Sequence, residues 1–380
     1  MFYKYFKLIS HKLKIAYLVT RSDTIGGSHI HVRDMAVALK EEGAEVNVLM
    51  GGKGPIVDHF ESYGLDPIII KHLTRNISPF NDLKAYRQIK EELARLQTDL
   101  VSTHSSKAGF LGRIAAHTLQ IPVLFTAHGW SFTTGKKAMN RWIYRQLENY
   151  AARYTDVIIT VSDYDNRLAR QHLNVPAEKV ITIHNGMPDV ESENGEKQKS
   201  GSVVHIAKIA RFDQQKDHME LLNALEPLDS YHLHLVGDGP LMEPVQQHAK
   251  KLNMADKITF HGRLNSVEEV LKKSHLFVLI SNWEGFPRST LEAMRASLPV
   301  IVSDVGGAAE AVDEGNTGYV VPKGDVNTLR DRLSTLIYDS ELRMKMGQAA
   351  RIKYENEFTF QRMYQKTKDI YRMVLKSDEL

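Results

Sequence analysis

Short apolar runs alternate with stretches of helical periodicity along most of the chain. The first run, KIAYLVT at 14–20, is followed by a glycine turn and by a segment, 29–42, whose apolar residues lie three and four positions apart. Short apolar strands separated by helices are typical of a parallel sheet that is covered on both faces. The predicted strands are 14–20, 45–50, 99–104, 123–128 and 156–162 in the first half of the chain and 203–209, 232–236, 258–260, 276–280 and 300–303 in the second half.

A polar segment separates the two series of strands. Residues 187–201, MPDVESENGEKQKSG, contain no apolar period and are typical of an interdomain linker. We therefore predict an α/β domain over 1–186, the linker over 187–201 and a second α/β domain over 202–355. The final segment, 356–380, carries one apolar helical stripe, which we expect to cross back to the first domain. The stripe consists of Phe360, Met363, Tyr364, Thr367, Ile370, Tyr371 and Val374.

Composition and charge exclude several classes of protein. The net charge of +3 does not favour nucleic acid as a partner, and the absence of cysteine excludes disulfides and thiolate metal sites. No apolar run reaches the roughly 18 residues that span a bilayer. The first residues, MFYKYFKLISHKLK, lack the features of a signal peptide, which favours a cytoplasmic protein. This basic, aromatic segment either contacts an anionic membrane surface or simply precedes the first strand.

The segment 283–294, WEGFPRSTLEAM, carries the strongest chemical signal. It follows a predicted buried strand, Gly285 permits an unusual turn, and Pro287 suits the first turn of a helix. A glycine turn that leads into a helix presents free N–H groups and a partial positive charge, and this combination predicts a phosphate site. Glu284 precedes the helix and Glu292 lies within it. One carboxylate can therefore face a ligand from the loop, while the other can accept hydrogen bonds from hydroxyls such as a ribose diol.

This E-x7-E pattern resembles the signature of the retaining glycosyltransferases of family 4, and the resemblance extends over nearly the whole chain. It implies the GT-B fold, in which two Rossmann-like, doubly wound parallel-sheet domains face a central cleft that holds a nucleotide sugar. It also implies that Glu284 lies beside the transferred sugar and that Glu292 binds the nucleotide ribose. The family often has an apolar residue at the position of Arg288, and an extra cation is compatible with a diphosphate. The donor-binding residues between the two carboxylates are then Phe286, Pro287, Arg288, Ser289 and Thr290.

A second match is the segment 209–218, IARFDQQKDH, directly after a predicted strand. The family has an Arg and a Lys here, which correspond to Arg211 and Lys216, and both bind the donor diphosphate. Without a metal ion, fixed cations have to stabilise the negative charge that develops on the departing diphosphate. An arginine is suited to bidentate contact with phosphate oxygens.

The first domain offers fewer signals. Gly26 and Gly27 open a predicted helix, and the family has such a Gly-Gly turn opposite the diphosphate; the alternative is an ordinary tight turn. His128 follows a predicted strand, where open α/β sheets bind ligands, and the family has a His there that contacts the donor sugar. His104 ends the preceding strand, and we assign it with Lys107 to the acceptor side. The predicted catalytic residues are His128, Arg211, Lys216 and Glu284.

Two further positions complete the predicted donor site. Gly237, in the turn VGDGP, and Arg263, in HGRL, follow strands at which the family meets the nucleotide. Two His-x-His pairs, at 29–31 and 232–234, raise the question of a metal ion. Neither pair has an evident third ligand nearby, and no Asp-x-Asp follows a strand. We therefore predict no metal site and no cofactor.

The resemblance implies transfer of a sugar from a nucleoside diphosphate, with uridine as the expected base. The expected acceptor is a saccharide or a lipid-linked saccharide in bacterial polysaccharide assembly, reached at the inner membrane face. The main alternative is a nucleotide-sugar epimerase on the same scaffold, because a fold does not fix a function. A non-catalytic subunit of a polysaccharide-making complex is a third possibility, but the charged donor-site residues argue against it.

Overall fold

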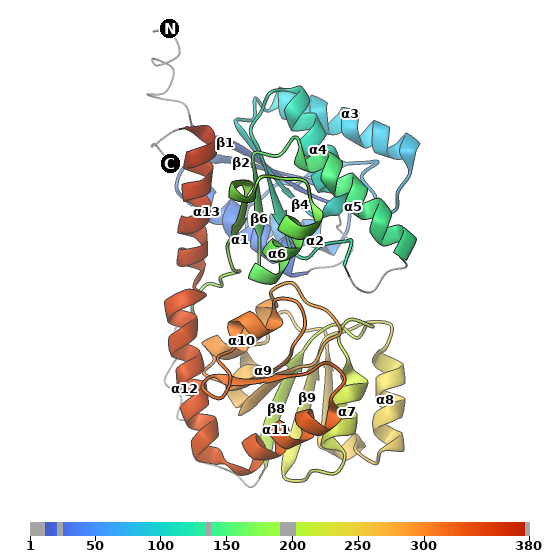
Figure 1. The fold of residues 1–380 in the computed structure, drawn as a ribbon, viewed down its shortest axis with the longest axis vertical. Coiled ribbons are helices and arrows are strands. Elements are labelled where there is room, and N and C mark those ends of the chain that lie inside the picture. Colours follow the sequence, from blue (N-terminus) through green and yellow to red (C-terminus); the bar gives the residue numbers. More distant parts are fainter. Residues whose placement is uncertain (1–11, 21–25, 134–137, 191–202, 377–380) are drawn as a thin grey trace. The chain divides into compact units, whose positions relative to one another are not determined.

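The structure is a computed structural model that describes residues 12–20, 26–133, 138–190 and 203–376. The chain forms two compact units (Figure 1). The N-terminal unit consists of Met1–Ile183 together with Tyr364–Leu380, and the C-terminal unit consists of His184–Met363. The first residues of the basic N-terminal segment and most of the predicted linker lie outside the described residues.

A parallel sheet of seven strands, in the order β3-β2-β1-β4-β5-β6-β7, forms the centre of the N-terminal unit. Strands β4 and β5 are buried along their whole length, as expected for strands with helices on both faces. The strands are β1 Lys14–Val19, β2 Glu45–Gly51, β3 Ile68–Ile70, β4 Leu100–His104, β5 Val123–Ala127, β6 Val157–Thr160 and β7 Val180–Thr182. The helices are α1 Gly27–Glu41, α2 Pro55–Glu61, α3 Pro79–Arg95, α4 Ser106–Thr118, α5 Ala138–Ala152 and α6 Asp163–His172.

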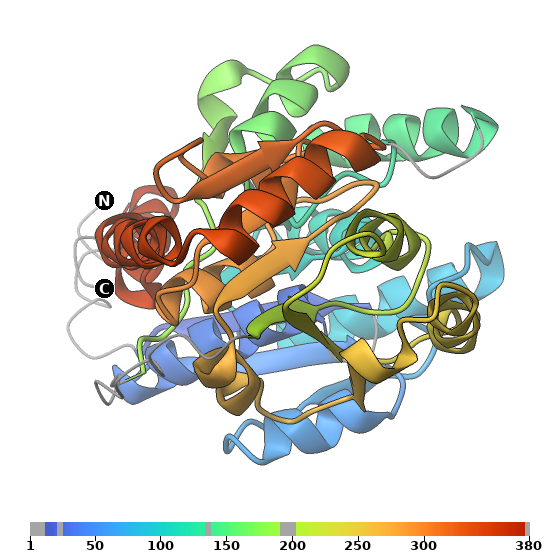
Figure 2. The ribbon, with the colours of Figure 1, turned by 90° about the horizontal axis from the view of Figure 1, so that it is seen from below.

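The C-terminal unit repeats this plan with a parallel sheet of six strands in the order β10-β9-β8-β11-β12-β13. Figure 2, which looks at this unit from below, shows α7 and α11 beside the sheet. The strands are β8 Val204–Ile209, β9 Tyr231–Val236, β10 Ile258–Gly262, β11 Leu276–Leu279, β12 Val300–Ser303 and β13 Gly318–Val321. The helices are α7 His218–Leu225, α8 Met242–Lys251, α9 Glu268–Lys273, α10 Arg288–Arg295, α11 Val326–Tyr338, α12 Ser340–Glu357 and α13 Phe360–Leu375.

The predicted fold class, two doubly wound parallel-sheet domains, is confirmed. All ten predicted strands are present, with ends that differ by one or two residues. Three strands were not predicted: β3, β7 and β13. They are only three or four residues long, so their apolar runs are too short to stand out from the surrounding loops.

Helix α13 carries the apolar stripe that the sequence places near the end of the chain. Its residues from Tyr364 onward belong to the N-terminal unit. The hydroxyl of Tyr371 lies 2.9 Å from that of Tyr17 on β1, and both side chains are buried. Lys368 forms an ion pair with Glu42, just after α1. Burial raises the pKa of both Tyr17 and Tyr371, so this hydroxyl pair stays neutral at physiological pH. Figure 1 shows the helix running beside α1.

The loops after β8 and β9 touch each other through their backbones. Gly237 and Gly239 both adopt positive φ angles, of 140° and 150°. A Cβ atom at Gly237 would lie 2.1 Å from the carbonyl oxygen of Ala210, and one at Gly239 would lie 2.4 Å from that of Phe212. The amide of Phe212 donates to the carbonyl of Asp238 at 2.8 Å. Only glycine permits this approach, because a side chain would occupy the space of the neighbouring backbone.

We expect Gly237→Ala to lower the free energy of unfolding of the C-terminal unit by about 3 kcal/mol, because strain adds to a backbone clash. Gly262→Ala is the matched control. Its φ is 65°, and nothing lies within 4 Å of the added Cβ, so it should cost about 1 kcal/mol. Urea denaturation followed by circular dichroism measures both values. Equal losses in the two variants would contradict the steric explanation.

Candidate functional site

The segment with the E-x7-E pattern connects β11 to α10 in the C-terminal unit. Strand β11 is buried throughout, and α10 begins at Arg288 with Pro287 as its N-cap residue. A proline side chain cannot accept a hydrogen bond, so the first N–H groups of α10 receive no cap from the N-cap side chain, and such a helix start is suited to an anion. Thr290 lies in this first turn and is fully buried, and its Oγ1 has no hydrogen-bond partner among the described residues. Backbone and hydroxyl donors therefore meet in one helical turn.

Glu284 and Lys216 form an ion pair although they lie 68 positions apart in the sequence. Only 5% of the Glu284 side chain and 16% of the Lys216 side chain are exposed. The Nε2 of Gln215 donates to the carbonyl of Trp283 at 2.8 Å and to Oε2 of Glu284 at 3.3 Å. A Cβ atom at Gly306 would lie 1.9 Å from the Glu284 carbonyl oxygen, so this glycine permits the loop to pass. The structure thus joins two predicted catalytic residues, and Gln215, which was not predicted, orients the carboxylate.

Two other predicted cations of the C-terminal unit, Arg211 and Arg263, face solvent, whereas Arg288 is half-buried and its Nη1 donates to the carbonyl of Gly186 at 3.3 Å. Arg211 lies on the same loop as Lys216, but 44% of its side chain is exposed, and its Nε lies 3.3 Å from Asp213. Arg263 is exposed in the loop after β10. The two loops follow β8 and β10, which lie on either side of β9 in the parallel sheet, and the carboxyl ends of such strands are where open α/β sheets bind ligands. The largely buried ion pair of Lys216 and Glu284 therefore lies at the same end of the sheet as the exposed side chains of Arg211 and Arg263.

Glu292 and Phe286 occupy different environments in the same segment. Burial raises the pKa of Glu292, while the charges of Arg288 and Arg295 act in the opposite direction. Glu292 nevertheless keeps a partly accessible side chain, as a hydroxyl-binding carboxylate requires. The ring of Phe286 is buried and packs against His184, with ring centroids 4.6 Å apart. Phe286 can therefore meet a donor through its backbone only.

A buried lysine that was not predicted from the sequence lies beneath the ion pair. Lys208 on β8 is fully buried, and its Nζ donates to the carbonyl oxygens of Asp217 at 2.9 Å and of Ile280 at 3.0 Å. Burial lowers its pKa from 10.5 to about 7. A neutral amine has two N–H donors, which match these two carbonyls. Lys208 therefore connects the loop after β8 to the end of β11. Its position within an apolar strand was the signal that could have identified it.

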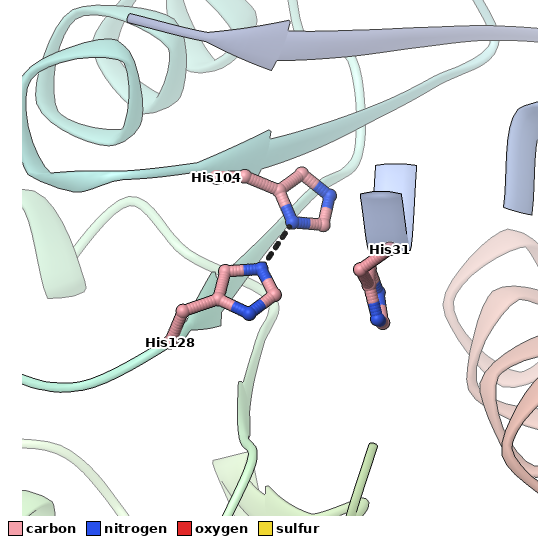
Figure 3. A group of neighbouring side chains, drawn as sticks. All are labelled: His31, His104 and His128. Atoms are coloured by element: carbon pink, nitrogen blue, oxygen red, sulfur yellow. Dashed lines mark hydrogen bonds between the residues drawn. The ribbon is translucent and has the colours of Figure 1, made fainter. Parts of the chain in front are cut away.

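Three histidines come together in the N-terminal unit, as Figure 3 shows. The Nδ1 of His104, at the end of β4, lies 3.0 Å from the Nε2 of His128, which follows β5. The ring of His31, on α1, lies 5.1 Å from that of His128 and 5.5 Å from that of His104, centroid to centroid. Burial lowers the pKa of His104 well below its usual value, and the neighbouring histidines add to this effect. The expectation that no third ligand lies near the histidine pair at 29–31 is therefore wrong, because the fold brings His31 to two distant histidines.

The remaining predicted residues of this unit have partners of their own. Gly26 is the N-cap of α1, and its amide donates to Nδ1 of His29 at 3.2 Å, with Gly27 next in the helix. Lys107, assigned to the acceptor side, forms an ion pair of 2.5 Å with Asp82. A bound acceptor would have to compete with this pair.

Two family models match the chain, one in each half. The model for Glycosyltransferase Family 4 matches residues 25–190, and the model for Glycosyl transferases group 1 matches residues 189–353. Together the two matches span most of the chain. The protein therefore belongs to the glycosyltransferases of family 4, with a group 1 domain as its second half, and it is an enzyme of this class.

Individual relatives agree with this assignment. The chain is 28% identical to UDP-Gal:alpha-D-GlcNAc-diphosphoundecaprenol alpha-1,3-galactosyltransferase of Escherichia coli, over 95% of this chain and 97% of that protein. It is 28% identical to the putative glycosyltransferase EpsD of Bacillus subtilis, over 89% and 92% of the two chains. The structure of Anabaena HepE in complex with UDP-glucose aligns with a TM-score of 0.83 at 19% identity, over 95% of this chain and all of that one. This structural likeness confirms the GT-B fold.

No helix in the described part of the chain has the length and apolar character needed to span a membrane.

The buried amine of Lys208 gives a test based on pH. Because its pKa is lower in the folded chain, the unfolded chain binds the extra proton between about pH 7 and 10.5, and stability rises with pH across this range. Lys208→Met removes this contribution. The stability of the variant relative to the wild-type chain should therefore fall by about 2 kcal/mol between pH 7 and 9. Urea unfolding at several pH values measures the difference, and a difference that does not change with pH would contradict a neutral Lys208.

Proposed function

We propose that this protein transfers a hexosyl group from a UDP-sugar to a saccharide acceptor carried on a diphosphate lipid, with retention of anomeric configuration and without a metal cofactor. One observation carries the proposal: the sheltered pair of Lys216 and Glu284 lies at the sheet edge from which α10 also starts. The donor and acceptor classes are supported by the names of the relatives, which include a UDP-galactose-dependent enzyme with a diphosphoundecaprenol acceptor.

The chemistry follows from the charge that the reaction creates. The bond between the anomeric carbon and the donor phosphate breaks, and a bond from that carbon to the acceptor oxygen forms. The departing diphosphate gains negative charge, which Lys216, Arg211 and the amides at the start of α10 stabilise. The acceptor proton passes to a phosphate oxygen. Glu284 and His128 orient the sugar and do not attack it.

Glu292 and the loop glycines complete the proposed donor site. The partial accessibility of Glu292 suits a carboxylate that accepts hydrogen bonds from a ribose diol. Gly237 and Arg263 are proposed to lie beside the nucleotide, and Gly26 and Gly27 to approach the diphosphate with their backbone. His104 and Lys107 are proposed for the acceptor side.

The proposed acceptor also indicates where in the cell the protein acts. A saccharide on a diphosphate lipid is held at a membrane, so we propose that the protein works at the cytoplasmic face of the membrane. The basic segment that would make a peripheral contact falls largely outside the described residues, and its membrane role stays a prediction from the sequence.

Removing either member of the ion pair should impair transfer. Lys216→Ala and Glu284→Gln should each lower kcat/KM for the UDP-sugar about 100-fold or more, because Lys216 stabilises the developing negative charge and Glu284 orients the sugar. Lys257→Ala, which removes a surface ion pair with Asp229, is the control and should keep its activity. Rates are measured by release of UDP in the presence of a lipid-diphosphate saccharide. Wild-type rates in both site variants would refute the assignment.

The product identifies the reaction class. NMR of the product should show the anomeric configuration of the donor, and the reaction should continue in the presence of a chelator. Incubation with UDP-sugar alone should leave the sugar unchanged apart from slow hydrolysis. Inversion at the anomeric carbon would contradict retention, and conversion of the donor to its epimer without an acceptor would support the alternative of an epimerase.

A further inference from the structure

We propose that His31, His104 and His128 form a binding site for a transition-metal ion of the Zn²⁺ class in the N-terminal unit. The three side chains come from α1, from the end of β4 and from the loop after β5. One ring nitrogen of each lies within 4.8 Å of the others. Figure 3 shows the three rings gathered around a common point. Three separate elements of the sheet-and-helix scaffold thus direct imidazoles to one place.

The distances are close to those that a metal needs. Zn²⁺ binds imidazole nitrogen at about 2.0–2.1 Å in tetrahedral geometry, which places ligand nitrogens about 3.3 Å apart. His104 Nδ1 and His128 Nε2 are already 3.0 Å apart. A ring nitrogen of His31 lies within 4.8 Å of a ring nitrogen of each of these residues. The His104 and His128 nitrogens therefore already have the separation that a metal needs. To bind an ion, the two rings would turn from each other toward it and release the proton that they share in the hydrogen bond.

The type of ligand selects the type of ion. Three imidazoles with no carboxylate suit Zn²⁺, Cu²⁺, Ni²⁺ or Co²⁺, whereas Mg²⁺ and Ca²⁺ prefer oxygen. This site would therefore not hold the divalent ion that commonly accompanies nucleotides in solution. Three protein ligands also leave a fourth position open, as in zinc sites that accept an exogenous ligand.

A second shell of hydrogen bonds supports the central ligand. The Oγ of Ser102 lies 3.1 Å from Nε2 of His104, and both groups are buried. Ser102 in turn hydrogen-bonds to Tyr371 of α13, whose hydroxyl contacts that of Tyr17. If His104 donates its Nε2 proton to Ser102, its Nδ1 carries the lone pair that a metal requires. Such partners orient metal-binding histidines in proteins of known metal content.

An ion at this site would act as an inhibitor of sugar transfer. This consequence, unlike binding itself, rests on the proposed function, in which His128 orients the transferred sugar. A metal-bound His128 would have its Nε2 lone pair occupied and its ring held beside His104. The same imidazole cannot then turn to the sugar. Transfer should therefore be sensitive to free Zn²⁺ although it requires no metal.

The binding test uses the full chain, treated with a chelator and then desalted. Titration with Co²⁺ should produce the visible absorption of a four-coordinate complex with one ion per chain, and Zn²⁺ should displace it. His31→Gln and His104→Gln should each weaken Co²⁺ binding at least 10-fold, and Ser102→Ala should weaken it by a similar factor. Circular dichroism identifies any variant that fails to fold. If His104→Gln does not fold, His31→Gln, which changes one side chain on helix α1, decides the test.

The matched control removes histidines from the other unit. His205, His234 and His261 lie in a row on neighbouring strands, with ring nitrogens 2.9 and 3.0 Å apart. The double variant His205→Gln/His234→Gln should bind Co²⁺ like the wild-type chain. Binding that is lost in this control and kept in His31→Gln would overturn the proposal, as would the absence of stoichiometric binding.

Activity then separates the two proposals. Zn²⁺ should inhibit transfer by the wild-type enzyme. Because His31 lies outside the proposed transfer site, His31→Gln should raise the Zn²⁺ concentration needed for inhibition at least 10-fold. Binding at the three histidines without any inhibition would support the metal site and contradict the role given to His128. Inhibition of equal strength in His31→Gln would contradict the metal site as its cause.

Discussion

The C-terminal unit depends on loops that pass one another at backbone contact. At Gly237, Gly239 and Gly306 an added Cβ atom would lie 1.9–2.4 Å from a neighbouring carbonyl oxygen. These contacts hold the loops after β8, β9 and β12 against each other and against the segment before α10. Because the loops are so close, Lys216 and Glu284 meet although they belong to different βα connections. Two opposite charges are then held, mostly shielded from water, where their interaction is stronger than at an open surface.

The sequence was sufficient for the architecture, because short apolar runs that alternate regularly with helical stretches are typical of a covered parallel sheet. It failed for Ile68–Ile70 and the other short strands, whose pairing depends on neighbours distant in the chain. The motifs proposed candidate donor-site residues, but their mutual contacts could not be predicted, since these depend on how the loops fold over one another. The protonation state of Lys208 could not be predicted either. Whether a lysine in a strand is charged depends on its burial, which only the folded unit determines. The group of three histidines was not predicted either, because His31 and His104 lie far apart in sequence and only the fold brings them together.

The two units solve the same electrostatic problem in different ways. The C-terminal unit offers fixed cations, Lys216 and Arg211, together with the start of a helix, which suit a diphosphate. The N-terminal unit offers imidazoles such as His104, which burial keeps uncharged at neutral pH. Under the proposed function, neutral imidazoles would orient a sugar hydroxyl without adding positive charge. The same neutrality suits imidazole nitrogens to binding a transition-metal ion.

The contact between Tyr17 and Tyr371 has a consequence for the way the protein is made. The N-terminal unit begins with the first strand, yet its last helix is encoded at the other end of the chain. During translation the C-terminal unit, which is continuous, leaves the ribosome complete while the sheet of the first unit still lacks the helix that covers Tyr17. The first domain to be synthesised is therefore the last to be completed, and the surface around Tyr17 stays uncovered until α13 packs on it.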